Sequence, residues 1–214
     1  ELRKILEHRT QELIEYQNLS YAKEYMSFVG NIFEKEQKTR SSSELSQNVA
    51  KYLFKLMATK DEYEVARLSL KAELDSAINK EFGKSAKISY MLHPPFLKAM
   101  ENIPILNMLP GVKSKLALGS WFKVFYVMLK NMKFLRGTPF DFMAWFSNDV
   151  RKADRKALNH YKSILSENID EIGNGKYQDL KDFSVLPDII RGYEEVRLET
   201  MDEFYLKSSN LFKS

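Results

Sequence analysis

The six residues from 136 to 141, Arg-Gly-Thr-Pro-Phe-Asp, form the densest polar loop that the sequence predicts. Arg136 can make two parallel hydrogen bonds to a carboxylate or to a phosphate group. Thr138 and Asp141 can cap the turn that follows, and Gly137 can adopt backbone angles that are closed to other residues. Two interpretations stay open here: the loop binds an anion, or an Arg–Asp ion pair holds the loop in place.

The remaining polar residues show no catalytic or metal-binding motif. The three histidines, His8, His93 and His160, are far apart in the sequence, which therefore predicts no metal site. His93 stands before a pair of prolines, where capping a turn is the favoured interpretation and ligand binding is the alternative. No Gly-x-Ser-x-Gly or Gly-x-x-x-x-Gly-Lys pattern occurs, which removes the usual anchors of acyl transfer and of phosphate loops.

A basic stretch lies in the middle of the chain. No acidic residue occurs between Glu101 and Asp141, and the cations that fall in this gap are Lys113, Lys115, Lys123, Lys130, Lys133 and Arg136. Aromatic residues between these cations could stack on bases, so nucleic-acid binding is one interpretation. The sequence disfavours it, because aromatic residues in such an apolar segment usually belong to a core and the net charge is only +4. We expect instead contact with an acidic partner surface, or with a phosphate-bearing cofactor that another domain holds.

The composition excludes several classes of site. The 214 residues include no cysteine, so this segment cannot form a disulfide, a cysteine-ligated zinc site or an iron–sulfur cluster on its own. The most apolar stretch, Leu116 to Leu129, is too short to cross a membrane and contains Lys123. We therefore expect a soluble, cytoplasmic protein. Because Glu1 already belongs to a helical pattern, we also expect a segment excised from a longer multidomain chain, with residues 1–214 as one helical domain.

The spacing of apolar residues predicts helices along most of the chain. The predicted segments are one long helix over 2–37, a second from 44 toward 82 with a kink near 59, a central helix over 116–135, a helix over 148–168, a short helix before 187 and a last helix over 188–207. Ser41 and Glu44 have the spacing of a capping box at the start of the second helix. Gly83 is a stop signal, and Gly173 to Gly175 predict a turn.

The region between the second and the central helix is harder to assign. Residues 87–92 predict a short strand or an extended segment, 96–102 a short helix and 104–114 a loop. The alternating polar and apolar residues of a sheet are missing elsewhere. The fold class that fits best is therefore mainly all-α, a multi-helix bundle with long N-terminal helices.

Several sequence blocks match one known family, in the order in which the family has them. The most specific block runs from Lys60 to Leu68, Lys-Asp-Glu-Tyr-Glu-Val-Ala-Arg-Leu, soon after Leu53-Phe54-Lys55-Leu56-Met57-Ala58. The other blocks are Tyr16 to Tyr25, Ser89 to Leu97, Gly119 with Trp121, Leu135 to Asp141, and Leu186-Pro187 with Ile190 to Tyr193. From about His8 to Thr200, the chain resembles the helical accessory domain near the C-terminal end of indolepyruvate ferredoxin oxidoreductase-like proteins.

The resemblance implies a parent enzyme that oxidatively decarboxylates aryl 2-oxo acids to acyl-coenzyme A. Such parents use thiamine diphosphate, iron–sulfur clusters and coenzyme A, with ferredoxin as the electron acceptor. This segment has no Gly-Asp-Gly thiamine motif and no cysteine, so no cofactor is expected within it. The resemblance thus implies a non-catalytic structural or interaction domain that docks on the catalytic domains of the same chain, or across a homodimer interface.

An alternative function is an anion-recruiting module. In this interpretation Lys60, Arg67, Arg136 and Arg191 gather around a coenzyme A phosphate or a substrate carboxylate. The full set of candidate binding residues is Lys60, Arg67, His93, Arg136, Thr138, Asp141 and Arg191. We predict neither a catalytic residue nor a metal ligand.

Overall fold

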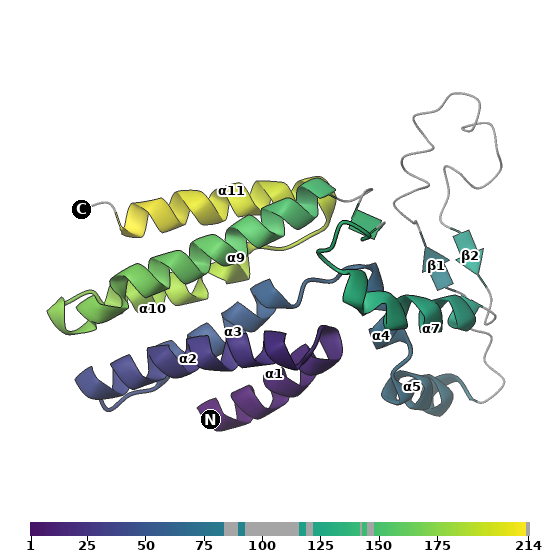
Figure 1. Ribbon diagram of the computed structural model, residues 1–214, viewed down its shortest axis with the longest axis horizontal. Coiled ribbons are helices and arrows are strands. Elements are labelled where there is room, and N and C mark those ends of the chain that lie inside the picture. The colour runs from purple at the N-terminus through teal and green to yellow at the C-terminus, as the bar shows by residue number, and fades with distance from the viewer. Residues whose placement is uncertain (84–89, 93–115, 119–121, 142, 145–147, 213–214) are drawn as a thin grey trace. The chain divides into compact units, whose positions relative to one another are not determined.

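The computed structural model describes residues 1–83, 90–92, 116–118, 122–141, 143–144 and 148–212 (Figure 1). The described part of the chain is mainly helical, which confirms the predicted all-α bundle. The chain divides into two compact units, which we call unit 1 (Glu1–Thr59 with Asp149–Ser214) and unit 2 (Lys60–Asn148). The prediction of one domain over 1–214 stays a prediction.

Unit 1 begins with a helical hairpin. The single helix predicted over 2–37 is wrong, because the chain forms α1 (Leu2–Tyr16) and α2 (Leu19–Thr39). The break lies at Asn18, whose extended backbone ends the first helix and whose side chain accepts a 2.9 Å hydrogen bond from the Tyr21 backbone N–H. This contact caps the second helix. Each of the two helices buries one apolar face. Because the spacing of apolar residues continues from the first helix into the second, the sequence pattern did not reveal the break.

The start of α3 (Glu44–Met57) uses a cap that the local sequence did not predict. The expected capping box of Ser41 and Glu44 is wrong, since the cap comes from Glu36 on α2. The Glu36 carboxylate has no exposed surface and accepts the backbone N–H groups of Leu45 at 3.0 Å and Ser46 at 2.9 Å. A buried carboxylate therefore neutralises the positive N-terminal end of the neighbouring helix.

The second half of unit 1 contains three helices and two 3₁₀ turns. They are α9 (Asn148–Asn168), η4 (Ile169–Asn174), α10 (Tyr177–Val185), η5 (Leu186–Ile189) and α11 (Glu194–Leu211). The helix over 148–168 and the short helix before 187 are confirmed, as is the turn, which ends at Gly175 with φ +97°. The last helix does not begin at 188. Pro187 starts only a 3₁₀ turn, and Gly192 with φ +81° separates that turn from α11.

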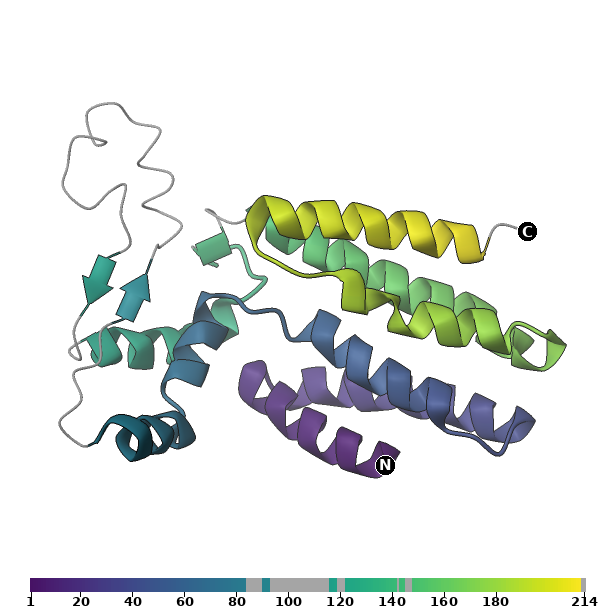
Figure 2. The ribbon, with the colours of Figure 1, turned by 180° about the vertical axis from the view of Figure 1, so that it is seen from behind.

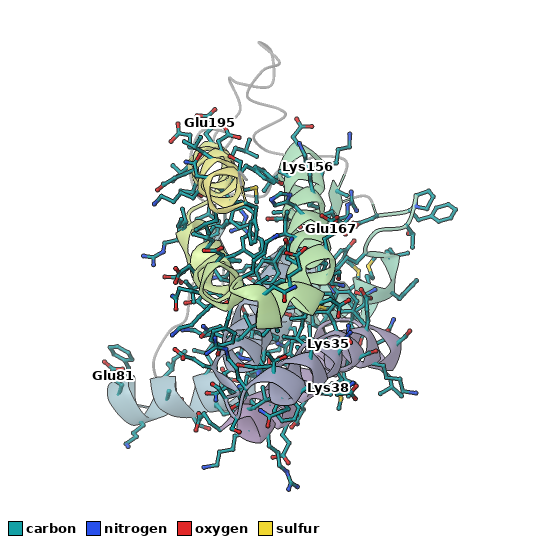
Figure 3. All side chains as sticks on the ribbon, turned by 90° about the vertical axis from the view of Figure 1, so that its left-hand side faces the viewer. Lys35, Lys38, Glu81, Lys156, Glu167 and Glu195 are labelled. Atoms are coloured by element: carbon teal, nitrogen blue, oxygen red, sulfur yellow. The ribbon has the colours of Figure 1, made fainter. Side chains whose placement is uncertain are left out.

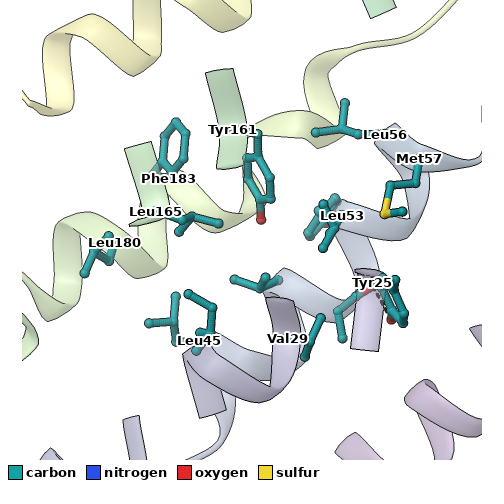
Figure 4. Packing of buried hydrophobic residues seen from close by; sticks show 14 of the residues in the cluster. Tyr25, Val29, Leu45, Leu53, Leu56, Met57, Tyr161, Leu165, Leu180 and Phe183 are labelled. Carbon is teal, nitrogen blue, oxygen red and sulfur yellow. Dashed lines mark hydrogen bonds between the residues drawn. The ribbon is translucent and has the colours of Figure 1, made fainter. Parts of the chain in front are cut away.

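One hydrophobic core joins the two halves of unit 1. Figures 1 and 2 show α9 and α10 lying along α2 and α3, with α1 and α11 at opposite edges of the unit. Tyr161 and Phe183 from the second half pack into the same cluster as Tyr25 and Leu53 from the first half (Figure 4). Charged side chains such as Lys38 and Glu195 point outward instead (Figure 3).

Two fully buried tyrosines of this core, Tyr25 and Tyr161, have hydrogen-bonded hydroxyl groups. The Tyr25 hydroxyl donates to the Ala50 carbonyl at 2.8 Å, and the Tyr161 hydroxyl donates to the Ser184 carbonyl, also at 2.8 Å. Burial raises the pKa of Tyr161 well above its ordinary value, so its hydroxyl keeps its proton. These bonds remove the penalty of burying a polar atom and fix the helices in register.

Unit 2 contains α4 (Glu62–Ser69), α5 (Ala72–Phe82), α7 (Lys123–Asn131) and η3 (Met132–Leu135). The helix predicted from 44 toward 82 is therefore three helices, and a full break replaces the predicted kink near Thr59. The stop signal at Gly83 is confirmed, with φ +80° directly after α5. The core of this unit lies between α4 and α7, where Tyr63 and Ala66 pack against Tyr126 and Leu129.

A two-stranded antiparallel ladder belongs to unit 2. The strands are β1 (Tyr90–Leu92) and β2 (Leu116–Leu118), with Tyr90 opposite Leu118. The predicted extended segment is thus confirmed for 90–92, whereas the helix predicted over 116–135 is wrong at its start. The helical part of that segment, α7, is also not the central helix that was predicted, because its Val124 is 76% exposed. The short helix expected over 96–102 and the loop over 104–114 lie outside the described residues.

Candidate functional site

Two segments that are far apart in the sequence meet through an ion pair in unit 2. Arg136, directly after η3, places Nη2 2.8 Å from Asp61 Oδ1 and Nε 2.5 Å from Oδ2. The two side chains are only 13% and 7% exposed. Asp61 Oδ1 also accepts the Glu64 backbone N–H at 2.9 Å. Asp61 is therefore both the N-cap of α4 and the partner of Arg136. Arg136 therefore pairs with an aspartate, Asp61, that lies outside the predicted loop.

Asp141 holds the other end of the polar loop. Its carboxylate is 2% exposed and accepts the Tyr63 hydroxyl at 2.9 Å and the Gly137 backbone N–H at 3.1 Å. Thr138 closes the turn between them, since its hydroxyl donates to the Leu135 carbonyl at 2.7 Å. Gly137 has φ +77°, in the left-handed region that favours glycine. The loop is therefore tied to α4 at both of its charged ends.

Arg67 is buried against its own helix. Its Nε and Nη2 lie 2.8 Å and 2.7 Å from the two carboxylate oxygens of Glu64, with side chains that are 6% and 9% exposed. We call the set Asp61, Tyr63, Glu64, Arg67, Arg136 and Asp141 the unit 2 network. Removing one partner from such a buried pair costs about 3–5 kcal/mol, because a buried charge is left unpaired. The network therefore favours one arrangement of α4 and the loop.

The described members of the predicted site fall in two different units. Arg67, Arg136, Thr138 and Asp141 belong to unit 2, as does the exposed Lys60 that precedes α4. Arg191 belongs to unit 1, where it is 69% exposed and bonds Asp188 at 2.6 Å. His93 lies outside the described residues. The gathering of these cations around an anion stays a prediction, and the arginines of unit 2 already have carboxylate partners.

A histidine–serine contact in unit 1 escaped the sequence reasoning. His160 Nε2 lies 2.8 Å from Ser208 Oγ, and the ring packs edge-on against Phe204 and Tyr205. Burial lowers the pKa of His160. A nucleophile next to a base has this geometry, but Ser208 is 1% exposed and no substrate can reach it in this arrangement. The two residues lie 48 positions apart, so no local motif could have revealed the pair.

Glu36 is surrounded by a second set of residues that the sequence did not predict. Besides the two amides of α3, the carboxylate accepts the hydroxyl of Ser46 and, at 2.9 Å, that of Tyr177 from α10. Glu36 stands in a run of charged residues that is typical of a solvated helix face, so its burial had no signal in the sequence. Three helices of unit 1 converge on this one side chain.

Metal-binding and membrane-spanning features are both lacking in the described part of the chain. No group of three or more histidine, aspartate or glutamate side chains there could hold a metal ion. None of the helices described is both long and apolar enough to cross a membrane.

Comparison with known proteins gives one match to a family model. Residues 2–209 match the model described as a family of unknown function, DUF6537. No curated protein and no solved structure matches the chain.

Proposed function

The chain belongs to DUF6537, a family of unknown function, so we propose a function from its resemblance to indolepyruvate ferredoxin oxidoreductase-like proteins and from the contacts of its own residues. It is a non-catalytic structural and interaction domain of a thiamine diphosphate-dependent 2-oxoacid:ferredoxin oxidoreductase in the cytoplasm. The parent enzyme oxidatively decarboxylates aryl 2-oxo acids such as indolepyruvate, with iron–sulfur clusters and coenzyme A in its other domains. This domain docks on those catalytic domains, or across the interface of a homodimer, while ferredoxin is a partner of the parent.

One observation supports the structural part of this proposal. The two blocks that carry much of the resemblance, 60–68 and 135–141, supply the whole unit 2 network. Each carboxylate and guanidinium in that network has a partner inside the unit, so these residues hold a fold together. A site built for a reacting ligand would instead leave polar groups facing an accessible space.

The proposal for the parent enzyme is tested by removing the domain. Deleting residues 1–214 from the parent chain should lower indolepyruvate-dependent ferredoxin reduction by about tenfold or more, which corresponds to about 1.4 kcal/mol. Adding the separate domain should restore part of the rate, because docking alone is required. Turnover that is unchanged by the deletion would contradict the proposal. A parent gene without a thiamine motif and cysteine clusters would remove the oxidoreductase assignment.

The structural role of the unit 2 network is tested by a double-mutant cycle. Arg136→Gln should destabilise the protein by about 3–5 kcal/mol, because it removes the guanidinium that donates two hydrogen bonds to the buried Asp61 carboxylate. Adding Asp61→Asn should recover part of that loss, giving a coupling energy of about 1–3 kcal/mol in urea unfolding. The control is Arg3→Gln, since the Arg3–Glu7 pair is exposed and its loss should leave stability unchanged. Additive effects of the two substitutions would show that the ion pair does not hold the loop.

A further inference from the structure

Two cationic side chains of unit 1 share one carboxylate. Lys55 from α3 and Arg191 from the segment before α11 both bond Asp188 in η5. Lys55 Nζ lies 3.5 Å from Asp188 Oδ1 and 3.1 Å from the Asp188 carbonyl oxygen. Arg191 Nη2 lies 2.6 Å from Asp188 Oδ2 and its Nε 2.9 Å from the same carbonyl. One carboxylate therefore serves two positive side chains.

A third cation, Arg197 on α11, lies near enough to Lys55 for its charge to lower the Lys55 pKa. Its Nε and Nη2 lie 2.8 Å and 2.7 Å from Asp154 Oδ1 on α9. Thr200 ties it to Arg191: the Thr200 hydroxyl accepts the Arg191 backbone N–H at 3.2 Å and lies 2.9 Å from the Arg197 carbonyl oxygen. The backbones that carry the two arginines are thus fixed to each other before any ligand binds.

Among the described residues named above, positive charges outnumber negative ones. Lys55, Arg191 and Arg197 carry three positive charges, and Asp188 and Asp154 carry two negative ones. The side chain of Lys55 is only 34% exposed. Burial lowers the pKa of Lys55, Asp188 raises it, and the two arginines lower it further. An additional negative charge at this position would relieve the repulsion among the three cations.

We propose that Lys55, Arg191 and Arg197, all residues of unit 1, bind a phosphate group. Arginine matches the geometry of a phosphate with two parallel N–H donors, and lysine adds a compact point charge. Asp188 is 51% exposed and acts as a stand-in anion that the phosphate displaces toward solvent. The ligand is a small molecule that carries a phosphate or diphosphate. This inference goes beyond the proposed structural function and does not depend on it.

The binding experiment uses the whole 214-residue chain with inorganic pyrophosphate, inorganic phosphate, adenosine diphosphate and malonate as probes. Isothermal titration at constant ionic strength measures each dissociation constant. We expect pyrophosphate to bind more tightly than malonate, because the dicarboxylate has less charge on each group. Comparing adenosine diphosphate with pyrophosphate shows whether the ligand is a nucleotide or a free diphosphate. The proposal would be overturned if malonate bound as tightly as pyrophosphate, or if pyrophosphate bound no more tightly than chloride ions do.

Three variants locate the binding. Lys55→Met and Arg191→Gln should each weaken pyrophosphate binding by about tenfold or more, the loss expected for one charge-assisted contact of about 1.4 kcal/mol or above. Lys207→Gln is the matched control, since Lys207 is an exposed cation on α11 that pairs with Glu203. The Lys207→Gln variant should bind pyrophosphate with the affinity of the unsubstituted chain. If all three variants bind equally, the anion lies elsewhere and the proposal is wrong.

A second readout does not require a variant to fold. Reductive ¹³C-methylation of the lysines allows the Lys55 pKa to be followed by NMR. Saturation with pyrophosphate should raise the Lys55 pKa, because a bound anion favours the charged ammonium. The ¹³C-methyl signals of Lys207 serve as the control and should not respond to pyrophosphate. A Lys55 pKa that is insensitive to saturating pyrophosphate would contradict direct contact.

Discussion

Glu36 illustrates how a single residue can join elements across the whole of unit 1. Its carboxylate has no exposed surface, and its two oxygens accept bonds from α3 and α10. Such a group is stable as an anion only while its donors stay in place, because an ionised carboxylate without partners is costly in a protein interior. The positions of α3 and α10 are therefore coupled to one buried side chain.

Glu36→Gln tests this coupling with almost no change of shape. Glutamine offers one oxygen where four donors converge, and its NH₂ group would face donors instead of acceptors. We expect a loss of about 2–4 kcal/mol in the free energy of unfolding, measured by urea titration with circular dichroism. Tyr177→Phe, which removes one of the bonds, should cost only about 1 kcal/mol. Equal losses for the two variants would contradict the view that the charge matters.

His160 should make stability depend on pH near neutrality. Burial and the nearby Lys156 lower its pKa in the folded chain, while Glu167 raises it, and the net direction is downward from 6.5. The unfolded chain therefore takes up the proton first as the pH falls. Stability should be complete above about pH 6.5 and decline as the pH falls from there toward the lower folded pKa. Urea midpoints of His160→Gln should fall less between about pH 8 and about pH 5 than those of the unsubstituted chain.

At the scale of the element, two glycines have opposite roles. Gly192, with φ +81°, separates η5 from α11, and an added Cβ would lie 2.7 Å from Val196 Cγ1. Gly30 lies inside α2, with nothing within 4 Å of an added Cβ. Gly192→Ala should cost about 1–3 kcal/mol, whereas Gly30→Ala should add about 0.5–1 kcal/mol by reducing the freedom of the unfolded chain. Thermal unfolding of the two variants gives the signs, and a stabilising Gly192→Ala would refute the strain.

The elements with clear end signals were predictable, and those with tertiary determinants were not. Residues 148–168 form one helix as predicted, and Gly83 ends α5, because both depend on local chemistry. The break at Asn18 was missed because two packed helices continue one apolar spacing. Strand β2 spans three residues, which is too short for a period of two to be recognised, and its pairing with β1 is not encoded locally.

The candidate site, too, was predictable from the sequence only where it depends on neighbouring residues. The polar loop at Arg136 was evident from composition, since Gly, Thr, Pro and Asp favour a turn. Its partner Asp61 is 75 residues away, and one sequence has no pattern that links the two. The cation cluster around Asp188 was also missed, except for Arg191, because its members come from separate helices.

At the scale of the molecule, unit 1 is built from two separate stretches of chain. Fragments 1–59 and 149–214 each contribute to one core, so neither buries its apolar face alone. We expect each fragment to show little helix by circular dichroism, and an equimolar mixture to regain it. Leu165→Ala, at a fully buried position, should weaken association by about 2–5 kcal/mol. Leu206→Ala, at a position 61% exposed, is the control and should not. Full helicity of one fragment alone would contradict a shared core.

This division has a consequence during protein synthesis. The ribosome completes α1 to α3 and must then translate roughly 90 residues of unit 2 before α9 appears. At about 5–20 residues per second, the nascent apolar faces of α2 and α3 wait for about 5–20 seconds without their partner helices. In that interval they are suitable ligands for ribosome-associated chaperones, and the yield of folded protein should depend on translation speed through unit 2.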